Sequence, residues 1–178
     1  FKPLGLAAAV AAASAGYAGV VNAQAELSDN SNLGDMAIVP YYTVREGYAT
    51  GITIINTSEY TTAVKLRFRR APDSMDALDF NIILSPEDVY TGYIGAENDE
   101  IVFRSGDNSC TAPAYPADTG FVMSDIYKEG ADEGYIEIVS MGSVASGPAY
   151  LAALHGADGV PANCARVRDN FFPGANSS

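Results

Sequence analysis

The stretch Thr61-Thr-Ala-Val-Lys-Leu-Arg-Phe-Arg-Arg70 decides the fold class, because apolar and basic side chains alternate in it more regularly than elsewhere in the chain. Its apolar members Val64, Leu66 and Phe68 fall on one side, and its basic members on the other: Lys65, Arg67 and Arg69. Successive side chains of a β-strand point to opposite faces, so this alternation predicts a half-buried strand with one wet face.

Six further segments have strand character and are separated by turn residues. Their apolar and β-branched content predicts strands at 37–44, 48–56, 78–84, 89–94, 100–104 and 134–141. Pro40 cannot donate a backbone hydrogen bond, so the first strand is expected at a sheet edge or at a bulge. Seven short strands without a helix long enough for a crossover predict an all-β protein, an antiparallel immunoglobulin-like β-sandwich.

Two segments of the expected sandwich domain, residues 36–178, lack this strand pattern. Residues 105–133 are expected to form a long irregular loop that contains Cys110, Pro113 and Pro116. Residues 148–156 and 162–170 are expected to form short C-terminal helices. A structureless loop of this length is unusual unless it is tethered or functional.

Residues 1–25 have the composition of a secretion signal peptide. Lys2 precedes an Ala-rich apolar run over 4–21, and the small residues Ala23 and Ala25 suit a cut before Glu26. A cut before Gln24 is the other expected position. Either cut leaves a polar, turn-forming tail that ends at residue 35.

Two other interpretations of the apolar N-terminus stay open. A membrane anchor needs about 20 strongly apolar residues, whereas this run is mostly Ala and Gly and contains Ser14 and Gly16. A pilin-like stem would carry a glutamate where this chain has Gly5. We therefore expect an exported protein, located in the periplasm, at the cell surface or outside the cell, with no membrane span in the mature chain.

The charge balance restricts the kinds of partner that we expect the protein to bind. The 178 residues contain 22 acidic and 10 basic side chains, which gives a formal net charge of −12. Nucleic acids select basic faces, so the composition argues against a nucleic-acid partner. The chain contains eleven tyrosines, and tyrosine is enriched at protein contact surfaces.

Cys110 and Cys164 are the two cysteines, and an even count in an exported protein predicts a disulfide. Such a bond would pin the long loop and the C-terminal segment to the sandwich. The alternatives are two free thiols or a metal site. A zinc site would need two more ligands, and His155 is the only histidine.

No catalytic or cofactor motif stands out, and we expect a protein that is not an enzyme. Ser143 and Ser146, the serines near His155 in sequence, do not belong to a G-x-S-x-G elbow. The acidic turns at 97–100 and 129–133 have the character of solvated turns rather than of a paired-carboxylate site.

Calcium is the one cofactor that the sequence leaves open as a ligand of the protein. Residues 29–35 begin like a calcium loop, but Leu33 stands where an oxygen ligand belongs. Residues 107–109, with Asp73 and Asp76, are other oxygen-rich places without a complete pattern.

The cationic stripe, which we define as Lys65, Arg67, Arg69 and Arg70, is unusual in so acidic a chain. It would pair with carboxylates on a neighbouring strand, each exposed pair contributing under about 1 kcal/mol. The functional alternative is a contact face for an acidic partner, including a second copy of this chain.

Seven segments carry a resemblance to a known family. They are 39–44, 51–57, 64–69, 78–88, 107–111, 133–138 and 158–164, with VPYYTV, GITIINT, DNSCT, GYIEI and DGVPANC among their motifs. In these segments the chain resembles an uncharacterised family of secreted proteobacterial proteins. The resemblance implies secretion and a longer chain, hence a truncated C-terminus here. That family has no established activity, so it assigns no catalytic residue.

The sequence as a whole favours a non-enzymatic structural or interaction module of the bacterial cell envelope or extracellular space. A calcium- or glycan-binding exported domain is the alternative. A filament subunit of the pilin-like kind is a third hypothesis. The sequence does not identify the protein or envelope partner.

Overall fold

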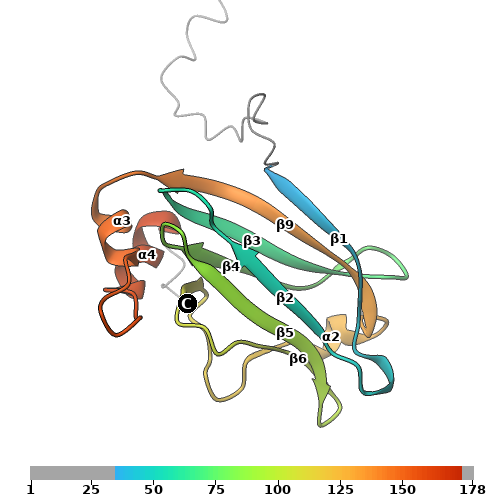
Figure 1. The fold of residues 1–178 in the computed structure, drawn as a ribbon. Coiled ribbons are helices and arrows are strands. Elements are labelled where there is room, and N and C mark those ends of the chain that lie inside the picture. The colour runs from blue at the N-terminus through green and yellow to red at the C-terminus, as the bar shows by residue number, and fades with distance from the viewer. Residues whose placement is uncertain (1–34, 174–178) are drawn as a thin grey trace, which may run out of the picture.

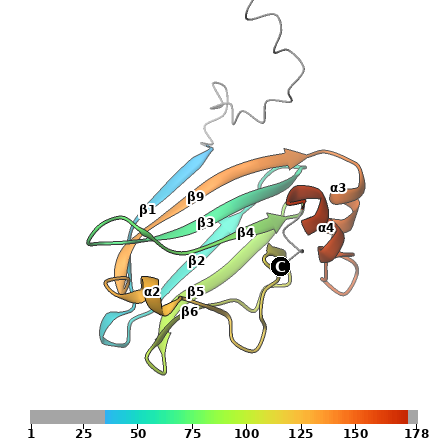
Figure 2. The same ribbon diagram turned by 180° about the vertical axis from the view of Figure 1, so that it is seen from behind.

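The computed structural model of the protein describes residues 35–173. The predicted signal peptide and all of the predicted tail except Asp35 lie outside the described residues. Two antiparallel β-sheets pack face to face in the described part, with two short helices at one end (Figures 1 and 2). This architecture confirms the predicted all-β antiparallel sandwich, while its immunoglobulin-like detail stays a prediction.

The first sheet has five strands in the order β1-β9-β3-β4-β7. Their bounds are Met36–Thr43, Glu133–Val144, Thr61–Arg70, Asp76–Leu84 and Cys110–Ala112. The second sheet has four strands in the order β2-β5-β6-β8, and they span Thr50–Ile55, Val89–Glu97, Glu100–Arg104 and Phe121–Val122. The register of β1 shifts between Val39 and Tyr42, so Pro40 lies at a bulge of an edge strand, as predicted.

The helices are short. α3 (Pro148–Ala153) and α4 (Cys164–Phe171) match the two predicted C-terminal helices, and a 3-10 turn, η2 (Arg45–Gly47), precedes β2. The segment 105–133 is less irregular than predicted, because it contributes β7, β8 and a single helical turn, α2 (Asp125–Lys128). No helix within residues 35–173 is long and apolar enough to cross a membrane.

The core between the sheets is built around aromatic rings. The ring centroid of Phe103 lies 5.0 Å from that of Phe80 and 5.8 Å from that of Phe68. Phe121, from the segment expected to be loop, stacks on Phe80 at 4.3 Å. A Cβ at Gly92 would lie 2.3 Å from the Phe103 ring, so only glycine lets β5 pass this close to the core.

The inner face of β3 is buried as the alternation predicts, but its outer face departs from the expectation. Val64, Leu66 and Phe68 are buried, whereas the three cations expected to be exposed are half-buried: Lys65, Arg67 and Arg69. Neighbouring carboxylates, described below, cover part of each cationic side chain.

A second, smaller core lies on the outer face of the five-stranded sheet. Helices α3 and α4 cover Ala63 of β3 and Ile83 of β4 there, and bury Ala152, Ala153 and Val167 in doing so. The Cys110–Cys164 disulfide joins β7 to the start of α4 and confirms the predicted bond. Asn163 caps α4, since its side-chain oxygen accepts the Arg166 N–H at 2.9 Å.

Candidate functional site

Strand β2 forms an edge of the four-stranded sheet and has no edge protection. It consists of Thr50-Gly-Ile-Thr-Ile-Ile55, without a charge or a proline. Proteins usually protect sheet edges with charges, prolines, bulges or very short strands. The other edges follow that rule: β1 has Pro40 and a bulge, while β7 and β8 have three and two residues.

The backbone of β2 leaves hydrogen-bonding groups free along this edge. Asn56 donates its N–H to the Asp88 carbonyl at 2.8 Å, and the register with β5 is unbroken from Thr50 to Ile55. In an antiparallel strand, the backbone groups of every second residue form hydrogen bonds with the same neighbouring strand. Therefore Ile52 and Ile54 bond to β5, and the N–H and C=O groups of Gly51, Thr53 and Ile55 point to the side where no strand of residues 35–173 pairs.

Beside this edge the five-stranded sheet extends beyond the four-stranded one. In Figure 1, β1 and the adjacent part of β9 are drawn above and to the right of β2, and no strand is drawn in front of them. The inner face is correspondingly less covered here, because Ala37 is exposed and Val39 and Ile138 are only partly buried. In the middle of the same sheet, Leu66 and Ile82 are fully buried.

A groove of about 310 Å³ lies at the end of this ledge where β2 ends and β1 begins, and the β2 residues in its lining are Ile54 and Ile55. Its apolar wall contains Ile54, Val64, Leu84 and Ile138. Its polar residues are mostly uncharged: Asn56, Thr57, Ser58, Thr62, Ser140 and Ser143, with the carboxylate of Asp35 at the start of β1. The groove and the free edge of β2 together are called the β2 ledge below.

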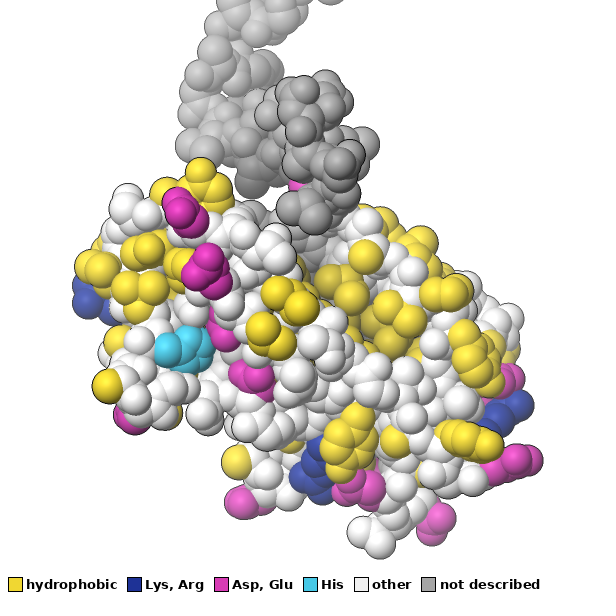
Figure 3. Space-filling model, viewed as in Figure 1, with side chains coloured by type: hydrophobic (Ala, Val, Ile, Leu, Met, Phe, Trp, Pro, Cys, Tyr) yellow, Lys and Arg dark blue, Asp and Glu magenta, His cyan; other side chains and the backbone are white. Residues whose placement is uncertain are grey.

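The outer face of the four-stranded sheet is uncharged along β2 as well. Cross-strand neighbours there are Gly51 with Tyr93, Thr53 with Thr91, and Ile55 with Val89. Ile55, Val89 and Tyr93 are exposed. Figure 3, which views this face, shows apolar and uncharged side chains over its central part and charged ones toward its margins.

The cationic stripe lies on the outer face of the five-stranded sheet, and its side chains pair with carboxylates. Lys65 contacts Asp79, and Arg69 lies 3.0 Å from a carboxylate oxygen of both Asp76 and Glu137. Arg67 lies 3.9 and 3.8 Å from the same two carboxylates. The stripe therefore has the cross-strand pairing that was one of the two interpretations of its sequence.

Arg70, the last member of the stripe, belongs to a turn. Its guanidinium forms two hydrogen bonds with the carboxylate of Asp73, which hold the pKa of that carboxyl below its usual range. It also donates to the Glu129 carbonyl at 2.9 Å. Arg70 thus ties the β3–β4 turn to the segment before β9.

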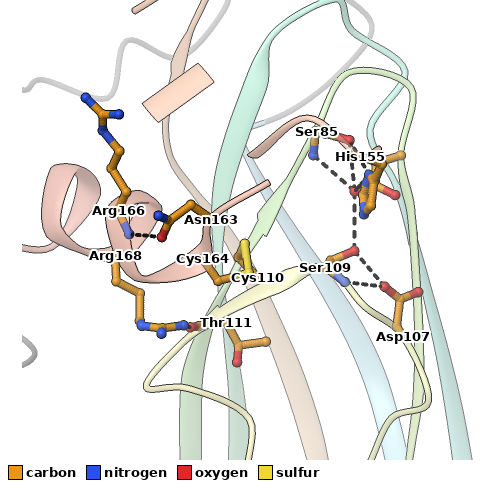
Figure 4. Close-up of a disulfide and its surroundings, with 11 residues drawn as sticks. Ser85, Asp107, Ser109, Cys110, Thr111, His155, Asn163, Cys164, Arg166 and Arg168 are labelled. Carbon is orange, nitrogen blue, oxygen red and sulfur yellow. Dashed lines mark hydrogen bonds and ion pairs between the residues drawn. A yellow bond between two sulfur atoms is a disulfide. The ribbon is translucent and has the colours of Figure 1, made fainter. Parts of the chain in front are cut away.

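The side chains of Ser85, Asp88 and His155 meet near the disulfide, although His155 lies 70 residues from Ser85 in sequence. Figure 4 shows Ser85 and His155 side by side. Nδ1 of His155 lies 2.9 Å from Oγ of Ser85 and 3.8 Å from the Asp88 carboxylate. A catalytic triad uses the two ring nitrogens separately, one toward the serine and one toward the aspartate. Here one nitrogen faces both partners, so the cluster lacks the geometry of an activated nucleophile.

This cluster instead holds three loops together. The Asp88 carboxylate accepts hydrogen bonds from the Ser85 backbone N–H at 3.1 Å and from the Ser109 hydroxyl at 3.3 Å. Ser109 also donates to Asp107 at 2.6 Å. The β4–β5 turn, the loop before β7 and the segment after α3 are thereby joined next to the Cys110–Cys164 bond.

The oxygen-rich places considered for calcium are engaged within the protein. Asp107 accepts from both the backbone and the hydroxyl of Ser109, and Asp73 and Asp76 face arginines. Of the loop 29–35 only Asp35 belongs to the described residues. Among residues 35–173 no group of three or more His, Cys, Asp or Glu side chains converges as metal ligands would.

Comparisons of the chain with protein-family models, with curated proteins and with solved structures give no match. The fold and the site therefore define the class of protein by themselves: an all-β, disulfide-linked sandwich with an unprotected edge strand. The resemblance to secreted proteobacterial proteins stays a prediction.

Two features of this site were not predicted from the residues. The histidine cluster was missed because Ser85 and His155 are 70 residues apart. The β2 ledge had a partial signal in the sequence, since the predicted strand 48–56 contains neither a charge nor a proline, a property that it shares with the predicted strand 89–94. Nothing in the sequence indicated that this strand would lie at an edge.

Proposed function

We propose that the protein is a non-enzymatic exported module of the bacterial cell envelope or extracellular space, and that it binds another protein. The observation that supports the proposal best is the β2 ledge. An uncharged edge strand is a template for pairing with another chain. It is joined here to a groove of about 310 Å³ with an apolar wall.

The chemistry elsewhere supports the same proposal. The serine, histidine and aspartate that meet near the disulfide have the contacts of a structural clasp. The cationic stripe and the carboxylates nearest to it are engaged with one another. The histidine cluster and the cationic stripe therefore stabilise the fold. The β2 ledge is then the favoured contact site for a partner protein.

Site-specific photo-cross-linking tests this proposal. A photoreactive amino acid in place of the exposed Thr53 is expected to give one discrete protein adduct in the exported fraction of producing cells. The same residue at the exposed loop position Asp118 is the matched control and is expected to give none. Equal adducts from both positions, or none from Thr53, would contradict the proposal. Saturable binding of calcium or of a glycan in calorimetry would favour the alternative function instead.

A further inference from the structure

The geometry points to strand addition as the mode of binding. We infer that the free edge of β2 takes up an extended segment of a partner protein, uncharged at its centre, apolar at alternate positions and flanked by basic residues. The inference rests on the proposed function and specifies its partner. Binding of this kind combines backbone hydrogen bonds for affinity with side-chain pockets for specificity.

The sandwich has space for one more strand beside β2. Neighbouring strands lie about 4.8 Å apart, so a strand added to β2 would lie over the inner face of β1 and β9. Its backbone would meet the free N–H and C=O groups of Gly51, Thr53 and Ile55. Its inward side chains would cover Ala37 and Ile138, which the described chain leaves exposed and partly buried.

The space beside β2 limits the size of the occupant. If β2 paired with β2 of a second copy, the β1 edge of one five-stranded sheet would overlap with the β1 edge of the other. Each five-stranded sheet already extends past its own β2, so the two ledges would collide under the joined sheet. A single extended segment fits beside β2, whereas a whole second sandwich does not.

The charges around β2 favour a particular kind of segment. Neither β2 nor the apolar wall of the groove contains a charge, so the centre of an added strand must be neutral to avoid burying an unpaired ion. Exposed carboxylates flank β2 along the chain, Glu46 before it and Glu59 after it. With a net charge of −12, the protein favours a segment that has basic residues at its two ends.

A peptide and a single proline test the inference. The probe is a fluorescent eight-residue peptide in which threonine and valine alternate between two terminal lysines. We expect saturable binding to the wild-type protein by fluorescence anisotropy and at least tenfold weaker binding to Thr53→Pro. Proline removes the N–H that points to the free edge and spares the ladder to β5. The matched control Thr53→Val keeps that N–H and is expected to bind within twofold of wild type.

Methylated peptides keep the test decisive even where Thr53→Pro fails to fold. Methylation of alternate backbone nitrogens blocks one edge of the peptide at constant charge. We expect only one of the two methylation patterns to abolish binding to the wild-type protein. Equal binding of both patterns, or wild-type affinity in a folded Thr53→Pro variant, would overturn strand addition. If the Thr53 cross-link persists in that case, the proposed function stands and only the mode is wrong.

Two further outcomes would assign the ledge to another occupant and overturn the inference. Peptide binding that appears only after residues 26–34 are deleted would show that the chain covers its own ledge. A wild-type dimer in sedimentation that Thr53→Pro converts to a monomer would show that a second copy binds there. Absence of both peptide binding and the Thr53 cross-link would contradict the inference and the proposed function together.

Discussion

Replacing Phe80 with alanine is expected to lower the free energy of unfolding by about 3–5 kcal/mol, the range for losing a large aromatic side chain from a packed core. Phe80 is 1% exposed, and its ring stacks on that of Phe121 and lies tilted against that of Phe103. The change would leave a cavity where β4, β6 and β8 meet. Chemical denaturation followed by the near-ultraviolet signal of the tyrosines measures the loss.

Tyr48→Ala is the matched control for Phe80→Ala. Tyr48 is an aromatic residue of similar size with 66% of its surface exposed, so its replacement is expected to cost less than about 0.5 kcal/mol. Similar losses from the two substitutions would mean that the faces of the sandwich are assigned wrongly.

Removal of the disulfide is the second change with a large expected effect. The bond closes a separation of 54 residues, and the double change Cys110→Ala and Cys164→Ala is expected to cost about 4 kcal/mol by restoring entropy to the unfolded chain. Thermal unfolding of the oxidised protein and of the double variant measures this difference. An equal midpoint for the two proteins would contradict a stabilising role of the bond.

The structure also predicts where the double variant loosens. Helices α3 and α4 are held on Ala63 and Ile83 by a small core of mostly alanine contacts, so residues 148–173 should exchange their amides first. Phe121 and Met123 belong to the main core and should hold the second half of the 105–133 segment in place. Uniform loosening of the whole sandwich would contradict this division.

Local alternation was sufficient to predict the central strands. β3 was predicted with its observed bounds, Thr61 to Arg70, because one face packs on the core and the other carries charges. Strand β4 was predicted two residues shorter than observed, since Asp76 joins the ladder only through its pairing with Arg69, across a register shift at Ala77. Alternation therefore identifies strands that are half-buried along their whole length.

Features that depend on contacts distant in sequence could not be predicted in the same way. β7 and β8 are too short to show a period, and they become strands because β4 and β6 offer a partner. The alternation of β4 places Ile83 on the outer face, yet α3 and α4 bury it. The β2 ledge belongs to this group, because an edge is defined by the absence of a neighbour in space rather than by any residue of the strand.

Amide hydrogen exchange at β2 tests the central claim most directly. In the protein without peptide, the N–H groups of Ile52 and Ile54 should exchange slowly, because they bond to β5. Those of Gly51, Thr53 and Ile55 should exchange quickly and become protected when the threonine–valine peptide binds. Slow exchange of all five amides in the isolated protein, or fast exchange at Gly51, Thr53 and Ile55 with the peptide bound, would contradict an open edge that takes up a strand.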